Sequence, residues 1–434
     1  MDATKCPSHP VPTDSNTSSH RDDAMKFNQS HDVAFAVPFT HRLRFTESIA
    51  GDQFNVLQDV LMGGEAGPPK VMIVVDSDVM KHSADVRTIG RRLSECDSVR
   101  LVRGDDTPFA CVLPGGEVVK NSTDGVERVL NLINDHDLDR RSYIVVIGGG
   151  AILDAVGYAA AIAHRGVRLV RLPTTTLAQD DSGVGVKNAI NYFGKKNWVG
   201  TFAVPWAVIN DAGLLATLPD RDFRCGFSEA VKVSLLKSKD DFYFLCDNAR
   251  RIAARNMDVA FDAIQRSCVW HLKHITEGGD PFEALEARPL DFGHWSAHKM
   301  EPMSDYRIRH GEAVGIGVAL DCIYSSLVHG LPHAEMMSVC KCMHDLGMAL
   351  WDETLDDADV VMDGLEEFRQ HLGGRLTVTM LRGVGDPIDV HEIDSDKMRE
   401  AIRKLKTIST QLSAGENLGG ASRSAATPSV KAAV

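Results

Sequence analysis

An apolar run interrupted by three glycines is the feature that most constrains how this chain can fold. Residues 142–147 are Ser-Tyr-Ile-Val-Val-Ile, a composition typical of a strand buried in a parallel sheet. Residues 148–150 are all glycine, and residues 151–163 are small and apolar, as in a packed helix. A second apolar run follows over residues 167–172. Strand, glycine turn, helix and strand in this order predict a Rossmann-like, doubly wound parallel sheet.

The pattern on either side of this unit predicts two domains. Residues 70–76 form another apolar run that ends at Asp76, as expected of a buried strand whose carboxyl end faces a ligand. After about residue 211 helical spacing dominates and runs of β-branched residues largely vanish. We therefore expect an α/β domain over residues 32–210 and a mostly α-helical domain over residues 211–412.

Charge and composition disfavour several classes of function. The net charge of −13 disfavours a general binding surface for nucleic acid or anionic membranes. No apolar run reaches the roughly 18 residues of a membrane span. Residues 1–31 are polar and residues 413–434 are rich in Ala, Ser and Gly, so both are predicted to be disordered. Nine scattered cysteines indicate reduced thiols in a cytoplasmic setting.

The glycine turn is a candidate site for phosphate. Gly149 and Gly150 would leave bare backbone N–H groups at a helix N-terminus, where a pyrophosphate can bind. Asp154 lies one turn further on, either as an acid that compensates the helix dipole or as a nucleotide contact. The motif is not Gly-x-Gly-x-x-Gly, so a tight turn without a ligand is the alternative.

Residues 175–200 are unusually polar for the exit of a buried strand. Lys187, Lys196 and Asn197 recur among turn glycines, where they can neutralise a phosphate. Asp181 can take a proton or bind a hydroxyl. The alternative is a solvated, lysine-rich loop.

Histidines and acids in the second half have the spacing of metal ligands. His294 and His298 are four residues apart and would share one face of a helix, as would Glu229 and Lys232, which are three apart. His310 follows and can return on a neighbouring element. Two or three imidazoles with one carboxylate form a catalytic Zn²⁺ site. The residues alone leave open which histidines are ligands and whether any is.

Taken together, these segments resemble the 3-dehydroquinate synthase superfamily, the sugar phosphate cyclases. Residues 173–187 match Pro-Thr-Thr-x-Leu-Ala-x-x-Asp-Ser-x-Val-Gly-x-Lys, and residues 229–232 match Glu-x-x-Lys. Residues 292–298 match Phe-Gly-His-x-x-x-His, and residues 310–312 are His-Gly-Glu. With the glycine turn these motifs occur in the family's order over roughly two thirds of the chain, closest to an EboD-type, 2-epi-5-epi-valiolone synthase-like branch.

The resemblance implies where cofactors and substrate bind. Zinc, or cobalt in its place, would be held by Glu229, His294 and His310. NAD would contact Asp76, Glu117, Lys120, Gly149, Gly150, Asp154, Thr174, Thr175 and Lys196. The catalytic set would be Asp181, Lys187, Lys232, Glu283 and His298. Further substrate contacts would be Arg165, Asn197, Lys273 and Asp291, and Arg288 is a candidate substitute for a family arginine. Arg165 matches an arginine that reaches a neighbouring subunit's site, which implies a homodimer.

The implied reaction uses NAD⁺ without consuming it. A ring alcohol is oxidised, phosphate leaves by β-elimination, the hydride returns, and an intramolecular aldol step closes a carbocycle. Zinc acts as the Lewis acid.

Two departures from the family pattern bear on the substrate. The arginine that binds a substrate carboxylate in 3-dehydroquinate synthases is replaced by Ala287, and the family's asparagine is Asp291. Arg288 lies one residue along, which on a helix would turn it by about 100°. A carboxylate at position 291 suits a hydroxyl better, so we predict a neutral ketose phosphate similar to sedoheptulose 7-phosphate. The alternatives are 3-dehydroquinate synthase itself and a zinc-dependent polyol or glycerol dehydrogenase.

Overall fold

The computed structural model of the chain describes residues 30–61, 67–283, 288–372 and 374–415. Residues 1–39 and residues 40–434 form two separate units, and everything below concerns the second. The arm expected over residues 1–31 and the tail expected over residues 413–434 lie almost entirely outside the described residues.

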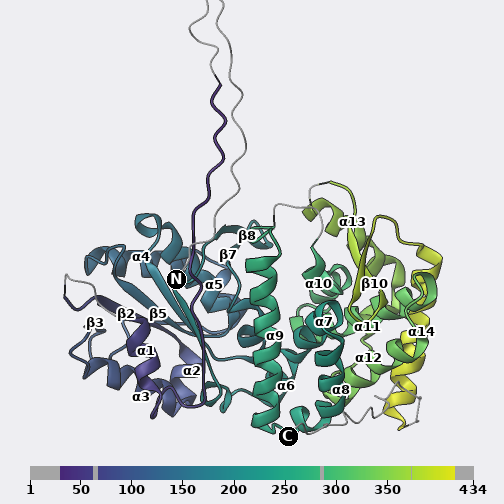
Figure 1. Cartoon of the computed structure of the whole chain (residues 1–434), viewed down its shortest axis with the longest axis horizontal. Coiled ribbons are helices and arrows are strands. Elements are labelled where there is room, and N and C mark those ends of the chain that lie inside the picture. Colours follow the sequence, from purple (N-terminus) through teal and green to yellow (C-terminus); the bar gives the residue numbers. More distant parts are fainter. Residues whose placement is uncertain (1–29, 62–66, 284–287, 373, 416–434) are drawn as a thin grey trace, which may run out of the picture. The chain divides into compact units, whose positions relative to one another are not determined.

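A parallel sheet forms the first part of the unit, as the sequence predicts (Figure 1). Its strand order is β1-β9-β6-β5-β2-β3, and β4 also pairs with β2, all in parallel. The strands are β1 (Leu43–Thr46), β2 (Lys70–Asp76), β3 (Arg100–Val102), β4 (Cys111–Leu113), β5 (Tyr143–Gly148), β6 (Arg168–Pro173) and β9 (Ala207–Asp211). The chain builds outward from β2 to β3 and then from β5 to β9 in the opposite direction. The sheet therefore has a topological switch point between β2 and β5, where ligands of such sheets bind.

Helices cover both faces of the sheet because successive side chains of its strands point in opposite directions. Val71, Ile73 and Val75 pack in one cluster with α1 (Phe54–Val60) and α3 (Ala84–Ser94). Met72 and Val74 pack in another with α4 (Asp124–Asp135) and α5 (Gly150–Ile162). The continuous apolar runs of β2 and β5 thus have a covered surface on each side. Short elements complete this part: α2 (Ser77–His82), the 3-10 helices η1 (Glu117–Lys120) and η2 (Ala163–Arg165), and the π-helical turn η3 (Ala178–Ser182).

An antiparallel hairpin, β7 (Lys187–Tyr192) and β8 (Lys195–Phe202), packs against α5. Gly157 of α5 is needed for this contact, since a Cβ there would lie 1.9 Å from Oδ1 of Asn188 on β7. That oxygen already accepts a hydrogen bond of 2.6 Å from the buried Arg171 guanidinium. Neither partner can move without breaking a buried contact.

Gly157→Ala should therefore destabilise the protein by about 1–3 kcal/mol, the usual cost of overpacking a core. Chemical denaturation compares it with Gly125→Ala on α4, where a new Cβ would meet nothing closer than 3.6 Å. The control should be neutral or slightly stabilising, because alanine favours helix by up to about 1 kcal/mol. Equal free energies of unfolding for the two variants would contradict this account of the hairpin contact.

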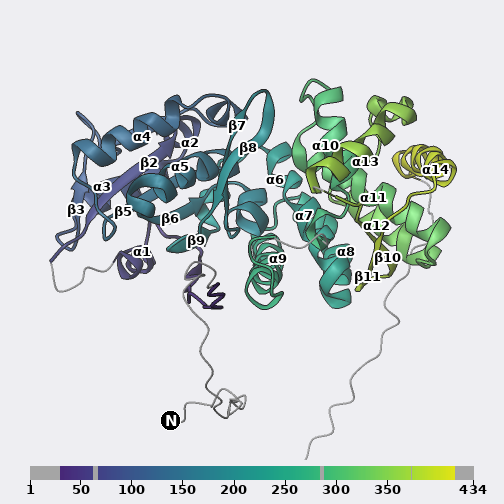
Figure 2. The ribbon, with the colours of Figure 1, turned by 90° about the horizontal axis from the view of Figure 1, so that it is seen from above.

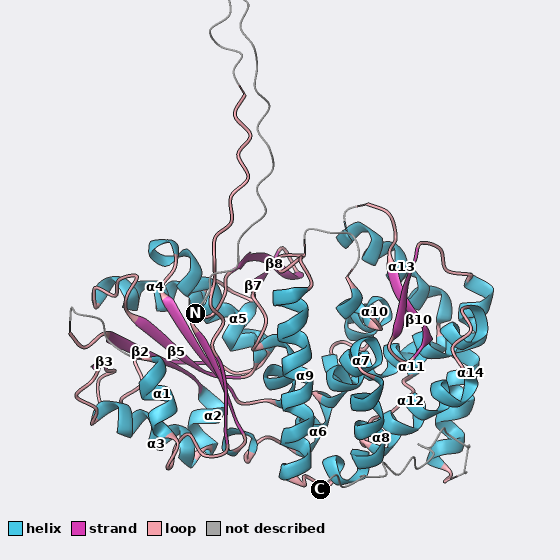
Figure 3. Cartoon of the chain, viewed as in Figure 1, coloured by secondary structure: helices cyan, strands magenta, loops and turns pink. Residues whose placement is uncertain are grey.

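The second part of the unit is helical, in agreement with the sequence (Figure 3). Its longer elements are α6 (Asp220–Cys225), α7 (Phe227–Lys237), α8 (Lys239–Ala253), α9 (Met257–Glu277), α10 (His294–Met303), α11 (His310–Val328), α12 (His333–Asp345), α13 (Ala358–Leu372) and α14 (Ser395–Ser413), with a ribbon of β10 (Val378–Gly383) and β11 (Asp386–Val390). The 3-10 helices η4 (Gly213–Leu215), η5 (Pro289–Asp291) and η6 (Glu353–Asp356) connect them. Figures 1 and 2 both place α9 between the sheet and the other helices.

Helix α11 is long and apolar enough to cross a membrane by length and composition, but it is a core helix of this fold. Of the window that passes that test, 78% is buried inside the protein. Within the described ranges no other helix passes the same test.

Candidate active site

The first group of candidate residues lies at the switch point of the sheet. Asp76 ends β2 and caps α2, where its carboxylate accepts hydrogen bonds from the N–H groups of Asp78 (2.8 Å) and Val79 (3.2 Å). Gly148 ends the neighbouring β5, and a Cβ there would lie 3.0 Å from that of Asp76. Burial raises the pKa of Asp76. The ends of β2 and β5 therefore approach so closely that a side chain at position 148 would crowd Asp76. Asp76 is an acid at the end of a strand, where such residues bind a nucleotide ribose.

The glycine turn leaves the N-terminus of α5 open. Gly149 is its N-cap with extended backbone, and no side chain caps the first turn. A Cβ on Gly149 would lie 3.1 Å from Cγ2 of Thr175, and one on Gly150 would lie 2.8 Å from Oγ of Ser182. Thr174, which precedes Thr175 in the chain, is buried, and its hydroxyl has no hydrogen-bond partner among the described residues. Free N–H groups at a helix N-terminus favour a phosphate.

Three more of the expected cofactor residues meet beside this turn. The Lys120 ammonium, which is buried, lies 2.8 Å from Oδ2 of Asp154 on α5 and also donates to Oδ1 of Asn197 on β8. Glu117, on the same 3-10 helix as Lys120, accepts a hydrogen bond of 3.0 Å from Asn191 of the hairpin. Burial raises the pKa of Asp154, while the charge of Lys120 opposes that rise.

The second group is a cluster of potential metal ligands. Glu229 lies in the first turn of α7, and His294 and His310 are the first residues of α10 and α11. Their ligand atoms all lie within 4.8 Å of one another. Oε1 of Glu229 is 3.6 Å from Nε2 of His294 and 3.9 Å from Nε2 of His310. One carboxylate with two imidazoles leaves coordination positions for substrate, as in a catalytic zinc site.

The electrostatics of this cluster suit a cation. Glu229 is fully buried, and burial raises its pKa although Lys232 opposes the rise. Burial, and after it the charge of Lys232, hold the pKa of His294 well below its usual value. His294 is therefore neutral, which is the form of histidine that binds metals. His298 is exposed, and its ring stacks on that of His310 with centroids 5.9 Å apart.

Glu301 is a site residue that the sequence analysis missed. It is buried, its Oε1 lies 2.8 Å from Nδ1 of His310, and its Oε2 lies 2.8 Å from the ammonium of Lys196. Burial alone would raise its pKa, but His310 and Lys196 together lower the pKa of Glu301 to about 2. The sequence did contain an indication that Glu301 belongs to the site: it follows His298 by three residues, which places both on one face of α10.

The expected substrate residues form a chain of charges next to the metal cluster. The Lys187 ammonium lies 2.5 Å from Oε1 of Glu283, and Nη1 of Arg288 lies 3.9 Å from Oε2 of the same carboxylate. Lys232 contacts Glu229. Burial would lower the pKa of Lys232, but the charges of Glu229, Asp181 and Asp291 raise it.

Two expected substrate residues lie apart from this chain of charges and from the metal ligands. Lys273 is exposed, and its ammonium lies over the ring of Trp270, 4.7 Å from the centroid. Arg165 is exposed at the end of η2 with a φ of 63°. Among the described residues, neither side chain forms an ion pair with Asp181, Glu229 or Glu283, whose ion-pair partners are His271, Lys232, His294, His310, Lys187 and Arg288. The α9 side chain that does reach the cluster is His271, which the sequence analysis did not select; its Nδ1 lies 2.7 Å from Oδ1 of Asp181.

Comparisons with known proteins agree with this architecture. Residues 110–225 match the family model described as 3-dehydroquinate synthase N-terminal, and residues 226–366 match 3-dehydroquinate synthase C-terminal. A protein named 3-dehydroquinate synthase from Ruegeria pomeroyi is 35% identical over 309 residues, 70% of this chain and 81% of the relative. One from Caulobacter vibrioides is 31% identical over 75% of this chain and 86% of its own.

Solved structures share the fold. The 2-epi-5-epi-valiolone synthase ValA from Streptomyces hygroscopicus subsp. jinggangensis, with NAD⁺ and Zn²⁺ bound, superposes with a TM-score of 0.76 at 24% identity, covering 87% of this chain and 99% of that one. A 2-deoxy-scyllo-inosose synthase complexed with carbaglucose-6-phosphate, NAD⁺ and Co²⁺ gives 0.69 at 22%, covering 83% and 96%. A butanol dehydrogenase from Thermotoga maritima gives 0.60 at 12%, covering 86% and 98%.

Proposed function

The chain belongs to the 3-dehydroquinate synthase family, a family of carbon–oxygen lyases that act on phosphates, and from this premise we propose how its site works. We propose that it binds NAD at the switch point of the sheet and a divalent metal, zinc or cobalt, on Glu229, His294 and His310. With these it would eliminate phosphate from a sugar phosphate and close a carbocycle.

One observation carries the proposal: two neighbouring residues of β8 contact both groups of site residues, the one beside the open N-terminus of α5 and the one around the metal ligands. Lys196 contacts Glu301, which holds the imidazole of His310, while Asn197 contacts Lys120, which holds Asp154 beside the open N-terminus of α5. A hydride acceptor and a Lewis acid bound at these places would lie on either side of the same substrate. Family chemistry requires that arrangement, because the oxidised alcohol and its polarised oxygen are one group.

When bound, the cofactors would supply a reversible hydride acceptor and a Lewis acid. The rest falls to the side chains. Lys187 and Lys196 would hold the phosphate, and Asp181 would accept or orient a ring hydroxyl. Glu301 would hold His310 in one orientation through its Nδ1. Ammonium groups positioned at the leaving phosphate favour elimination over the simple hydride transfer of a polyol dehydrogenase.

Glu301→Gln should weaken metal binding about 10–100-fold, the usual effect of removing the carboxylate that orients a metal-bound histidine. Titration of zinc against a competing chelator measures the affinity directly. Glu367→Gln is the matched control, since Glu367 forms an exposed ion pair with Lys299 on the protein surface. Unchanged affinity in Glu301→Gln would mean that His310 is not a ligand.

Among substrates, we propose the heptulosonate 7-phosphate of 3-dehydroquinate synthase as the first candidate. Relatives that carry this name are 31–35% identical over two thirds of the chain or more. Position 287, where the family arginine is replaced, lies outside the described residues, but Arg288 supports the proposal. Its backbone dihedrals, φ −124° and ψ 79°, are not helical, so the 100° turn expected of a helix does not apply. Its guanidinium lies 3.9 Å from Glu283, the carboxylate that also contacts Lys187.

A neutral ketose phosphate similar to sedoheptulose 7-phosphate is the second candidate, and Asp291 favours it. The carboxylate of Asp291 lies near enough to Lys232 to raise its pKa, so it belongs to the same substrate-facing group. A substrate carboxylate there would meet a like charge, whereas a hydroxyl would be accepted.

Separate reactions with each substrate, NAD⁺ and Zn²⁺ decide between them through inorganic phosphate release. The first candidate predicts turnover of the heptulosonate and a KM raised at least about tenfold in Arg288→Gln, the loss of one charge-assisted contact. Turnover of the heptulose alone, with no effect of Arg288→Gln on KM, would favour the second candidate. Phosphate retained on both sugars, with NADH accumulating, would contradict both.

We also propose that the protein acts as a homodimer. Arg165 is exposed in its own chain and lies away from the charge cluster, as expected of a group that serves a neighbouring subunit. Light scattering gives the mass in solution. Co-expression of Arg165→Ala and Lys187→Ala chains tests the exchange, since only the mixed dimer would contain one complete site.

A further inference from the structure

We propose that His271, rather than Lys273, is the α9 side chain that serves the substrate site, as the positioning residue for the Asp181 carboxylate. This inference rests on the proposed function, because it names a further residue of that same site. It departs from the family pattern, which assigns the position of Lys273 to substrate binding.

The geometry of α9 allows only one of the two residues to face η3, the turn that carries Asp181. Positions 271 and 273 are two apart, so their side chains diverge by about 200° around the helix. Nδ1 of His271 lies 2.7 Å from Oδ1 of Asp181, and the imidazole is only 12% exposed. The buried Ser267, one turn earlier, also lies on this side, with its Oγ 3.5 Å from the backbone oxygen of Asp180.

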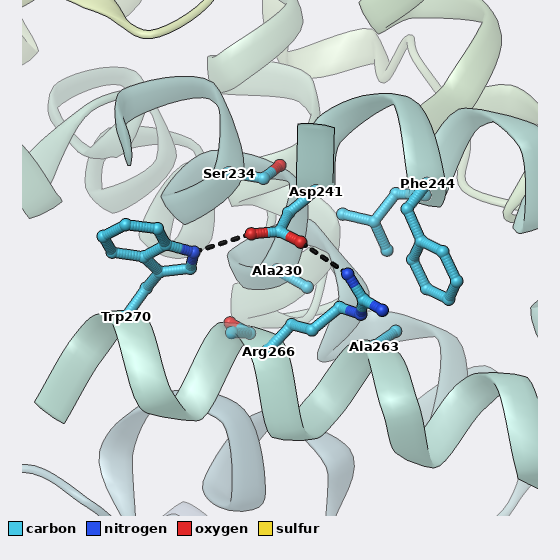
Figure 4. A pocket seen from close by; sticks show the side chains of 9 residues that line it. Ala230, Ser234, Asp241, Phe244, Ala263, Arg266 and Trp270 are labelled. Atoms are coloured by element: carbon cyan, nitrogen blue, oxygen red, sulfur yellow. Dashed lines mark hydrogen bonds and ion pairs between the residues drawn. The ribbon is translucent and has the colours of Figure 1, made fainter. Parts of the chain in front are cut away.

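Lys273 faces a different structure altogether. Its ammonium lies over the ring of Trp270. The indole N–H of Trp270 donates to Oδ2 of Asp241 at 2.7 Å, and the Arg266 guanidinium contacts Oδ1 of the same carboxylate at 2.8 Å (Figure 4). This group fixes the contact between α8 and α9 and leaves Lys273 at its outer edge, away from Asp181.

Asp181 lies among other acids, so a neighbouring group is needed to hold its carboxylate in place. Its neighbour Asp180 is fully buried with neither carboxylate oxygen hydrogen-bonded, and burial followed by the charges of Asp181 and Glu229 raises the pKa of Asp180 well above its usual value. Burial would raise the pKa of Asp181 as well. His271 is the strongest influence in the opposite direction, ahead of Lys232, and the pKa of Asp181 is lowered.

The other imidazole in this region does not share the role. His41 is buried, its Nε2 lies 2.9 Å from the carbonyl oxygen of Val184, and burial lowers its pKa to about 4. It is therefore neutral near pH 7 and is already engaged with the backbone. His271 remains the imidazole in contact with the carboxylate that would orient a substrate hydroxyl.

Steady-state phosphate release by three variants tests the role. His271→Ala should lower kcat about 100-fold, the effect of a reacting group misplaced by about 1 Å, with little change in KM. His271→Lys should recover at least a tenth of the wild-type kcat, since an ammonium can replace the imidazole beside Asp181. Lys273→Ala should lose at least tenfold less than His271→Ala. The inference is overturned if Lys273→Ala loses as much as His271→Ala, or if the lysine at position 271 recovers nothing.

A double-mutant cycle on the unfolding constant tests the contact without any turnover. His271→Gln and Asp181→Asn should be non-additive by at least tenfold, while Lys273→Gln and Asp181→Asn should be additive. Additivity in the first cycle would overturn the inference even in an active enzyme. A wild-type protein that releases no phosphate from any sugar phosphate would instead overturn the proposed function, so the two failures are distinguishable.

Discussion

Replacement of Glu229 by glutamine should remove the bound metal and lower phosphate release at least about a thousandfold, because the metal supplies several kcal/mol of transition-state stabilisation. Among the residues that the structure describes, Glu229 is the carboxylate grouped with both His294 and His310, and the ligand atoms of the three lie within 4.8 Å of one another. A neutral amide oxygen cannot balance a divalent charge in a fully buried position. Elemental analysis of the purified variant gives the metal content per chain, and a phosphate assay gives the rate.

The matched control is Glu353→Gln, which changes the same side chain at an exposed ion pair with Arg307. It should keep full metal content and rate. A Glu229→Gln protein that retained one metal per chain would show that the ion binds elsewhere, and one that retained the rate without metal would show that the reaction does not use it.

Replacement of Lys232 by methionine should destabilise the metal-free protein by about 3–5 kcal/mol, the cost of leaving one partner of a buried ion pair uncompensated. Both side chains of the pair with Glu229 are almost fully buried. Saturating Zn²⁺ should recover much of this loss, because the cation compensates the same carboxylate. Urea denaturation with a chelator and with zinc measures the two free energies of unfolding.

This metal dependence separates an active-site pair from an ordinary structural one. Lys239→Met provides the comparison, since its ion pair with Glu335 lies outside the cluster. Its effect on stability should be the same with and without zinc. An equal loss for Lys232→Met in both conditions would contradict a metal on Glu229.

The fold followed from local patterns that need no long-range information. The apolar runs of β2 and β5 have the length of buried strands, and they end in Asp76 and in glycine. Their order along the chain therefore indicated a parallel sheet with a ligand at the carboxyl ends of its strands. Local spacing also predicted that Glu229 and Lys232 lie together, because residues three apart share one face of a helix, here α7.

The missed residues depend on features that sequence spacing does not determine. Glu301 acquires its role from Lys196, which is 105 positions away on a hairpin. The sequence alone does not distinguish His271 from Lys273, and the orientation of α9 relative to η3 places His271 next to Asp181. Arg288 was a candidate substrate contact whose position depended on a helical backbone, and the non-helical dihedrals observed before η5 place its guanidinium 3.9 Å from Glu283.

The most direct test of the central claim is the carbon–carbon connectivity of the product, measured by NMR after reaction of a uniformly ¹³C-labelled heptulose or heptulosonate 7-phosphate with the zinc- and NAD⁺-loaded protein. Cyclisation gives a new one-bond coupling between the carbon that carried the phosphate and the former ketose carbonyl carbon, with phosphate released and no net NADH. An open-chain product that keeps its phosphate, formed together with one equivalent of NADH, would make this protein a dehydrogenase and contradict the account.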